Sequence, residues 1–209
     1  MTAEGKAPDP SRAASDTAID VLSDHIAARR AVAPAPVLVA LDGRSGAGKS
    51  TLARRVAART ATVVIDGDDF YRGGDDAFWL ARSPEEKVDL VIDWRRQRAL
   101  LAKLGRGEPA CWRPYDWEAD DGRLGAEVDV DPAPVVILDG AYSARAELAD
   151  LFALRALLDA PRDVRRERLL QREGERYRAE WVARWGAAED LYFEQLMPPE
   201  SFDLLLDGA

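Results

Sequence analysis

The chain has 209 residues, a length that suits one domain with a buried core, and 47% of its residues are hydrophobic while 32% are charged. Its formal net charge of -9 disfavours nucleic acid as a partner, because an acidic chain gains nothing from counterion release on a polyanion. No apolar run reaches the roughly 20 residues that span a bilayer, and the single cysteine, Cys111, cannot form an internal disulfide; we therefore expect a cytoplasmic protein without a membrane partner.

The first part of the chain predicts a tail, a helix and a strand. Residues 1–15 are rich in Ala, Pro, Asp and Ser and lack an apolar core, which favours a disordered tail before a single domain over 16–209. Apolar residues at helical spacing predict a helix over 16–32, which the prolines that follow would end. The continuous apolar run 37–41 predicts a strand buried on both faces, and a Gly-rich loop and a helix over 50–59 follow it.

The rest of the chain continues this alternation of strands and helices. Ser83, Pro84 and Glu86 form a helix start, and that helix is expected to reach about Leu104. The alternation predicts a three-layer α/β/α fold with a mostly five-stranded parallel sheet and a ligand crevice at the strand ends. Further segments expected are strands at 62–65, 135–138, 154–158 and 202–206, an irregular or hairpin insert at about 105–134, and an Arg-rich helical lid at about 161–185.

The loop after the first strand carries the clearest motif. Residues 43–50 match the pattern G-x-x-x-x-G-K-[ST] in full, and they leave a strand and open a helix as the motif requires. The glycines permit positive φ angles and let backbone N–H groups surround phosphates. Lys49 would reach the β- and γ-phosphates, and the Ser50 hydroxyl would ligate magnesium. This context disfavours a chance match and predicts a site for ATP and Mg²⁺ of the P-loop NTPase type, formed by Gly43, Ser45, Gly46, Ala47, Gly48, Lys49, Ser50 and Thr51.

An acidic residue follows the third predicted strand. Asp139 comes directly after the apolar run 135–138, and four apolar residues followed by an acid is the Walker B arrangement. The alternative is an ordinary Asp-Gly turn with Gly140. We predict Asp139 and Ser50 as magnesium ligands, and Asp139 and Lys49 as catalytic residues.

Three further acids, Asp66, Asp68 and Asp69, follow the second predicted strand. A solvated turn would also explain them, but their position beside the phosphate loop favours a chemical role. Phosphoryl transfer to an alcohol is assisted by a base that takes the hydroxyl proton. Because the only histidine, His25, lies in the first predicted helix, the base must be a carboxylate. Asp68 is our first choice and Asp69 the reserve.

These motifs resemble those of a known family. The segments 43–50, 68–71 (Asp-Asp-Phe-Tyr), 114–116 (Pro-Tyr-Asp) and 139–140, followed by an Arg-rich helix, occur in this order in uridine kinase-like nucleoside kinases. The resemblance covers about residues 37–207. It implies a kinase that transfers the γ-phosphoryl group of ATP, with Mg²⁺, to a nucleoside.

The resemblance also implies roles in binding the acceptor. Asp68 would be the general base on the sugar 5′-hydroxyl, and Asp93 would hold the ribose hydroxyls. Tyr71 and Tyr115 would line the nucleoside pocket. Trp117, beside Tyr115, has the flat ring needed to stack on an acceptor, although packing of the insert explains it equally well. The predicted substrate-binding residues are Asp69, Tyr71, Asp93, Tyr115 and Trp117.

Two arginines resemble the lid arginines of the family. Arg168 and Arg172 would close on the phosphates and act in catalysis, because the planar guanidinium clamps phosphate oxygens. The alternative is a solvated helix face with pairs such as Arg172 and Glu175. Asp139 falls where the family has a glutamate near magnesium.

The chain also departs from the family pattern. Residues 117–121 lack the histidine that helps to read the pyrimidine shortly after the Pro-Tyr-Asp tyrosine, and 174–177 (Gly-Glu-Arg-Tyr) replace the expected Arg-Gly-Arg of the lid. The acceptor is therefore left open between a nucleoside, a nucleoside-like natural product and another small alcohol.

Other classes of P-loop protein fit less well. The chain contains no asparagine, which rules out the N-K-x-D motif of GTPases, and it lacks the L-S-G-G-Q signature of transport ATPases. A P-loop ATPase without an alcohol acceptor and a catalytically idle nucleotide-binding protein are the remaining alternatives. We therefore predict a small-molecule kinase, monomeric or homodimeric, with nucleoside 5′-hydroxyls as the first expectation for the acceptor.

Overall fold

The fold is built around one parallel β-sheet. A computed structural model describes residues 10–33 and 36–209, with side chains outside 10–15 and 173–181. The strands pair in the order β2-β5-β1-β6-β7, and every pairing is parallel. Each strand coincides with a predicted apolar run, to within two residues at either end. The strands are β1 (Val37–Asp42), β2 (Thr62–Asp66), β5 (Val135–Asp139), β6 (Leu154–Asp159) and β7 (Leu204–Asp207).

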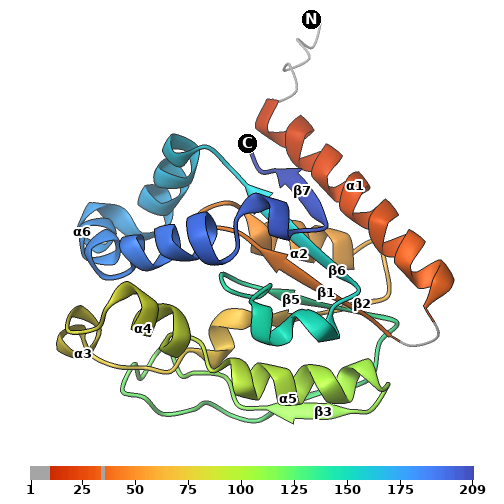
Figure 1. The fold of residues 1–209 in the computed structure, drawn as a ribbon, viewed down its shortest axis with the longest axis horizontal. Helices are drawn as coiled ribbons and strands as arrows, with labels where there is room; N and C mark the ends of the chain where they lie inside the picture. The colour runs from red at the N-terminus through yellow and green to blue at the C-terminus, as the bar shows by residue number, and fades with distance from the viewer. Residues whose placement is uncertain (1–9, 34–35) are drawn as a thin grey trace, which may run out of the picture.

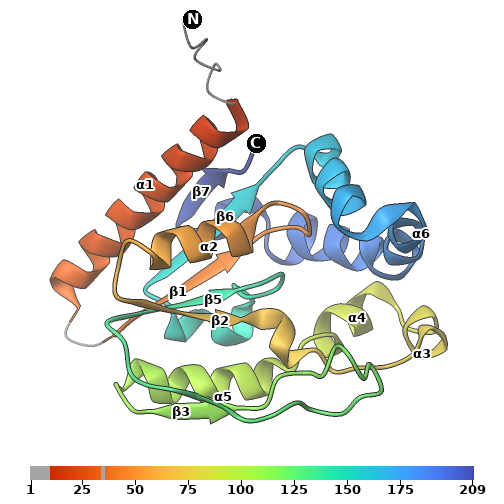
Figure 2. The ribbon, with the colours of Figure 1, turned by 180° about the vertical axis from the view of Figure 1, so that it is seen from behind.

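Helices cover both faces of the sheet and give the molecule three layers (Figures 1 and 2). The helices α1 (Pro10–Val32) and α2 (Lys49–Ala57) lie on one face, and α5 (Trp94–Gly105) lies on the other. Successive residues of β1 serve the two cores, because Val39 packs with α1 and α2 while Leu38 packs with α5. This burial on both sides explains the continuous apolar strands and confirms the predicted three-layer α/β/α fold.

The N-terminal helix is longer than predicted. It begins at Pro10, so residues 10–15 of the predicted tail belong to α1, while 1–9 lie outside the described part of the chain. A proline suits the first helical position because its missing N–H would have no intrahelical partner there. In the described ranges, no helix combines the length and the apolarity that crossing a membrane requires.

The predicted helix over 83–104 is wrong, because two helices occupy this stretch. The helix α4 (Pro84–Leu90) begins with a capping box formed by Ser83 and Glu86, as predicted, but it ends seven residues later. Backbone bonds to a distant segment interrupt it: Val91 O accepts from Arg72 N–H at 3.0 Å, and Asp93 N–H donates to Phe70 O at 2.8 Å. The second helix, α5, starts only after this bridge.

The insert after α5 is a hairpin-like excursion, one of the two predicted forms. It contains the antiparallel pair β3 (Ala110–Trp112) and β4 (Val128–Val130). The segment between them carries Tyr115 and Trp117 and passes close to Tyr71. The helix α6 (Arg162–Leu191) spans the predicted lid region and continues beyond it. The other short elements are α3 (Asp76–Leu80), η1 (Gly67–Phe70), η2 (Ala146–Leu151), η3 (Tyr192–Leu196) and η4 (Pro199–Ser201).

The carboxyl ends of the central strands meet at one edge of the sheet. Asp139 at the end of β5 pairs in register with Leu41 of β1 on one side and with Asp66 of β2 on the other. The phosphate loop leaves β1 at this edge. Parallel strands therefore bring together loop and acidic residues that lie almost a hundred positions apart in the sequence.

Candidate active site

The phosphate loop connects β1 to α2, and its glycines are sterically required. Gly43, Gly46 and Gly48 have φ angles of 150°, 80° and 104°, which are left-handed values that favour glycine. A Cβ on Gly43 would stand 2.2 Å from Leu158 O, and one on Gly46 would stand 2.6 Å from Arg165 O. The loop thus packs closely against β6 and the start of α6, and no larger residue fits at these two positions.

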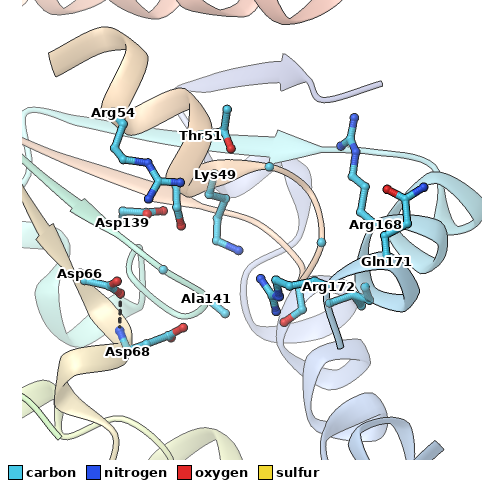
Figure 3. Close-up of a pocket in the computed structure, with 16 residues that line it drawn as sticks. Lys49, Thr51, Arg54, Asp66, Asp68, Asp139, Ala141, Arg168, Gln171 and Arg172 are labelled. Atoms are coloured by element: carbon cyan, nitrogen blue, oxygen red, sulfur yellow. Dashed lines mark hydrogen bonds between the residues drawn. The ribbon is translucent and has the colours of Figure 1, made fainter. Parts of the chain in front are cut away.

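Lys49, the first residue of α2, is buried under this loop. Its Nζ donates to Gly43 O at 2.7 Å and to Arg44 O at 3.2 Å. A cavity of about 510 Å³, which we call the donor cavity, opens beside it. In Figure 3 the acids lie on one side of this donor cavity and the arginines of α6 on the other, with Lys49 between them. The predicted residues that line it are Ser45, Gly46, Gly48, Lys49, Ser50, Thr51, Asp68, Asp139, Arg168 and Arg172.

The residues around Asp139 fit a magnesium ion. Asp139 is 3% exposed, and its Oδ1 is buried without a hydrogen-bond partner among the described residues. Burial raises the pKa of this carboxyl, while the Lys49 charge and a hydrogen bond with Ser50 lower it. A buried carboxylate oxygen with no partner, beside the serine of a phosphate loop, is the donor set that a hard divalent cation prefers. Ser50 and Asp139 could therefore hold Mg²⁺ together.

Asp68 lies in η1, directly after β2, and faces the same cavity (Figure 3). The carboxylate of Asp66 accepts from Asp68 N–H at 2.9 Å and fixes the turn. The Asp68 side chain is exposed to the cavity, and nearby protein partly removes water from around it. This desolvation, together with the charge of Asp66, raises the pKa of Asp68 to about 6, against the opposing charge of Lys49.

A second cavity of about 340 Å³ adjoins the first. Four residues line both: Ser45, Asp68, Ala141 and Arg172. We call the second space the acceptor cavity, because four of its twelve lining residues are aromatic and a ring-bearing molecule could pack against them. Its remaining lining residues are Tyr71, Val91, Ile92, Trp117, Tyr142, Arg184, Trp185 and Glu189.

Two predicted aromatic residues, Tyr71 and Trp117, line one wall of the acceptor cavity, and the third, Tyr115, is not among its lining residues. The rings of Tyr71 and Trp117 stack at 5.0 Å with an interplanar angle of 16°. Tyr115 lies edge-on to both rings, at 4.9 Å from Tyr71 and 4.8 Å from Trp117, and so supports the wall from behind. Trp117 is 54% exposed, which leaves much of its surface available to a ligand.

Two predicted substrate-binding acids are not among the residues that line either cavity. Asp69 follows Asp68 in the tight η1 turn and points to the insert, where its carboxylate accepts from Trp112 Nε1 at 2.8 Å. Asp93 caps α5 by accepting from Arg96 N–H at 3.2 Å. Both carboxylates have structural partners, so the geometry favours Asp68 over Asp69 as the base and gives Asp93 a capping role.

The two predicted lid arginines lie on α6 and face the donor cavity (Figure 3). Arg168 Nη1 donates to Ala47 O at 3.0 Å and to Gly208 O at 2.7 Å, so it ties α6 to the phosphate loop. Arg172 lines both cavities, and its charge lowers the pKa of Asp68. The other lid residues that the sequence singled out, 174–177, lie outside the side chains that the structure describes.

Two buried carboxylates of the site were missed by the sequence analysis. Asp42, at the end of β1, is fully buried and accepts from four donors: the N–H groups of Gly43, Tyr142 and Ala144 and the hydroxyl of Tyr192. Burial raises the pKa of Asp42 to about 6 despite these bonds. An acid at the end of an apolar strand, just before the loop glycine, was a signal that could have pointed to it.

The second missed carboxylate is Glu189 of α6. It is 4% exposed, and its Oε1 accepts from Ser45 N–H, inside the phosphate loop, at 2.9 Å. Nothing in the sequence distinguishes it from its neighbours Asp190 and Glu194, which are exposed and pair with Arg44. Only the way α6 packs on the loop separates the three.

Comparison with known proteins gives the family. No family model matches the chain. A uridine kinase from Deinococcus deserti is 31% identical over 143 residues, which cover 66% of this chain and 69% of that protein. A uridine kinase from Ureaplasma parvum is 24% identical over 178 residues, 78% of this chain and 83% of the relative.

Solved structures agree with the fold. A Bacillus stearothermophilus protein described as a possible uridine kinase superposes with a TM-score of 0.70 at 20% identity, over 92% of this chain and 98% of that one. A Silicibacter protein described as a candidate fructose transport system kinase also gives 0.70, at 22% identity, over 90% and 98%. The sequence match to the Deinococcus enzyme, the phosphate loop and the fold together show that the chain belongs to the uridine kinase family of P-loop kinases.

Proposed function

We propose that this kinase transfers the γ-phosphoryl group of ATP, with Mg²⁺, to a hydroxyl of a small ring-bearing acceptor, in the first place the 5′-hydroxyl of a nucleoside. The observation that supports this most directly is the position of Asp68, which lines both the donor cavity and the acceptor cavity. A general base for phosphoryl transfer has to stand between the two substrates in this way. The names of the sequence relatives support the nucleoside.

The residues of the donor cavity would bind the triphosphate. The loop N–H groups and Lys49 surround the phosphates, and the N-terminus of α2 adds a partial positive charge. Ser50 and Asp139 would hold Mg²⁺, which neutralises developing charge on the phosphate oxygens when bound. Arg172, which lines both cavities, would contact the transferred group.

In the reaction, the Asp68 carboxylate would accept the proton of the acceptor hydroxyl. The hydroxyl oxygen forms a bond to the γ-phosphorus, and the bond from that phosphorus to the β-γ bridging oxygen breaks. The products are the phosphorylated acceptor and ADP. The aromatic wall would hold the ring of the acceptor so that its hydroxyl faces Asp68, and α6 would exclude water by closing over the phosphates as a lid.

A second candidate acceptor is a small alcohol that is not a nucleoside. Among the described residues that line the acceptor cavity there is no histidine, asparagine or glutamine, the side chains that commonly read the edge of a base. A ring could therefore be bound by stacking alone, with its hydroxyls recognised elsewhere in the cavity.

An acceptor screen tests the proposal. ADP formation from ATP is measured with a panel of nucleosides, their 2′,3′-dideoxy analogues, sugars and small alcohols. At least one acceptor should raise the rate of ADP formation well above the rate without acceptor. If hydrolysis is the same with every compound, the protein is a P-loop ATPase without an alcohol acceptor and the proposal is wrong.

A further inference from the structure

We propose that Glu189 is a specificity-determining residue, a second carboxylate that binds hydrogen-bond donors of the acceptor. This inference rests on the proposed function, because it concerns the molecule that the acceptor cavity takes. It also assigns to α6 the contact with acceptor hydroxyls that the family resemblance placed on Asp93.

The first observation is the burial of Glu189 together with its incomplete set of partners. The residue is 4% exposed, yet among the described residues it forms no ion pair, and the one hydrogen bond it makes is from Ser45 N–H to Oε1 at 2.9 Å. Arg44, which directly precedes Ser45 in the phosphate loop, pairs with Asp190 and Glu194 and not with Glu189. A carboxylate has two oxygens and about four acceptor positions, so much of its hydrogen-bonding capacity is left for a ligand.

The second observation is that the Glu189 side chain lies at the acceptor cavity. Glu189 lines the acceptor cavity together with Tyr71, Trp117 and Trp185, and Asp68 lines the same space next to the donor cavity. The cavity therefore combines an aromatic wall with two carboxylates. One carboxylate would take the proton of the reacting hydroxyl, and the other would accept hydrogen bonds from neighbouring groups of the same molecule.

The charges in the cavity define the class of acceptor further. Arg184 is already paired with Asp76, and Arg172 also belongs to the donor cavity. The two carboxylates would repel an acidic acceptor, such as one that already carries a phosphate. The acceptor class that fits is a neutral or cationic ring-bearing alcohol with a second hydroxyl or an amine close to the reacting hydroxyl.

Because Glu189 also contacts Ser45, its role could instead be to hold the phosphate loop in place. Because Ser45 N–H belongs to the phosphate loop, a carboxylate that served only the loop would also be explained by this bond. The two roles differ in what they affect. Acceptor binding predicts a change in the acceptor KM, whereas a role confined to the loop predicts a change in the ATP KM or in hydrolysis without acceptor.

The test uses Glu189→Ala and Glu189→Gln with the best acceptor from the screen, and Asp190→Asn as the matched control on the adjacent, exposed position. Loss of a hydrogen bond to a charged group should lower kcat/KM for the acceptor by roughly 10- to 100-fold in Glu189→Ala. The ATP KM should stay within about threefold, since the glycines, Lys49 and Ser50 bind the phosphates. The control should change neither constant by more than about twofold.

A deoxy analogue separates a direct contact from a structural effect. The wild-type protein should prefer the hydroxylated acceptor over its dideoxy analogue, and both Glu189 variants should lose most of this preference. Glu189→Gln retains an oxygen for Ser45 N–H, so it answers the question even if Glu189→Ala unfolds. The wild-type preference is itself measured without any mutation.

The possible results separate a failure of the proposed function from a failure of the role assigned to Glu189. If no compound stimulates the wild-type protein, the proposed function fails and this inference fails with it. If an acceptor is found but the variants keep its KM, or the wild-type protein does not prefer the hydroxylated form, only the inference is wrong. A change confined to the ATP KM would likewise overturn it and leave Glu189 as a residue of the phosphate loop.

Discussion

Asp68 allows two separate predictions. Its position predicts how far kcat falls when the base is removed, and its pKa predicts how activity depends on pH. Replacing it with asparagine keeps the size of the side chain but removes the base. We expect the kcat of Asp68→Asn to fall by roughly 10²–10⁴, while the ATP KM stays nearly unchanged, because the amide cannot accept the hydroxyl proton. The substitution leaves untouched the loop residues that are proposed to bind the triphosphate.

The raised pKa of Asp68 predicts the pH dependence of the wild-type enzyme. A base acts in its deprotonated form, so activity should be present above its pKa and lost as the pH falls through it. With a pKa of about 6, roughly nine-tenths of the carboxyls are ionised at pH 7 and roughly one-tenth at pH 5. The acceptor kcat/KM should therefore fall about tenfold between these values, a dependence that Asp68→Asn should not show.

The assay is steady-state ADP formation with saturating ATP and Mg²⁺ across this pH range. Asp69→Asn is the matched control, since the adjacent carboxylate binds Trp112 and faces the insert. It should keep kcat within a few-fold of the wild-type value. If Asp68→Asn is fully active, or if Asp69→Asn loses as much activity, the choice of base is wrong.

Three further predictions concern the metal, the core and the acceptor wall. Asp139→Asn should raise the Mg²⁺ concentration for half-maximal activity by at least roughly 10-fold, and an unchanged Mg²⁺ titration would argue against Asp139 as a ligand. Burial raises the pKa of Asp42 from its ordinary value of 3.8 to about 6, so its stabilisation is present at low pH and is lost as the pH rises through 6. The free energy of unfolding of the wild-type protein minus that of Asp42→Asn should fall by about 2.5 kcal/mol from pH 4 to pH 7. A pH-independent difference in urea unfolding would contradict this. Trp117→Ala should raise the acceptor KM about 5- to 30-fold through loss of stacking, with the ATP KM as the internal control; an equal effect on both would indicate a folding defect.

Much of the fold could be predicted because the relevant signals are local. The strands at 37–42 and 135–139 are continuous apolar runs, which a sheet covered on both faces requires. The phosphate loop was recognisable because its spacing is short and each residue type answers a steric or electrostatic need. The capping box at Ser83 and Glu86 was local in the same way, and the structure has it.

The failures arose where distant segments decide the outcome. The helix predicted over 83–104 breaks at Val91 because Arg72 and Phe70, from another part of the chain, bind its backbone. No helical pattern can report such a bond, since it depends on where a second segment lies. Tertiary context overrode a sequence that was otherwise suited to one helix.

For the acceptor cavity, too, the sequence predicted some features and the tertiary structure decided others. The sequence alone determined that the phosphate loop and the acids would gather at one edge of the sheet, because parallel strands end at one edge and these motifs follow those strands. The aromatic residues were expected beside them from the family resemblance. Tertiary structure alone decided which acids line the cavities: Asp68 rather than its neighbour Asp69, and Glu189 on α6 rather than Asp93. The physical reason is that a side chain's direction and burial depend on contacts across the fold, whereas a motif records only order and spacing along the chain.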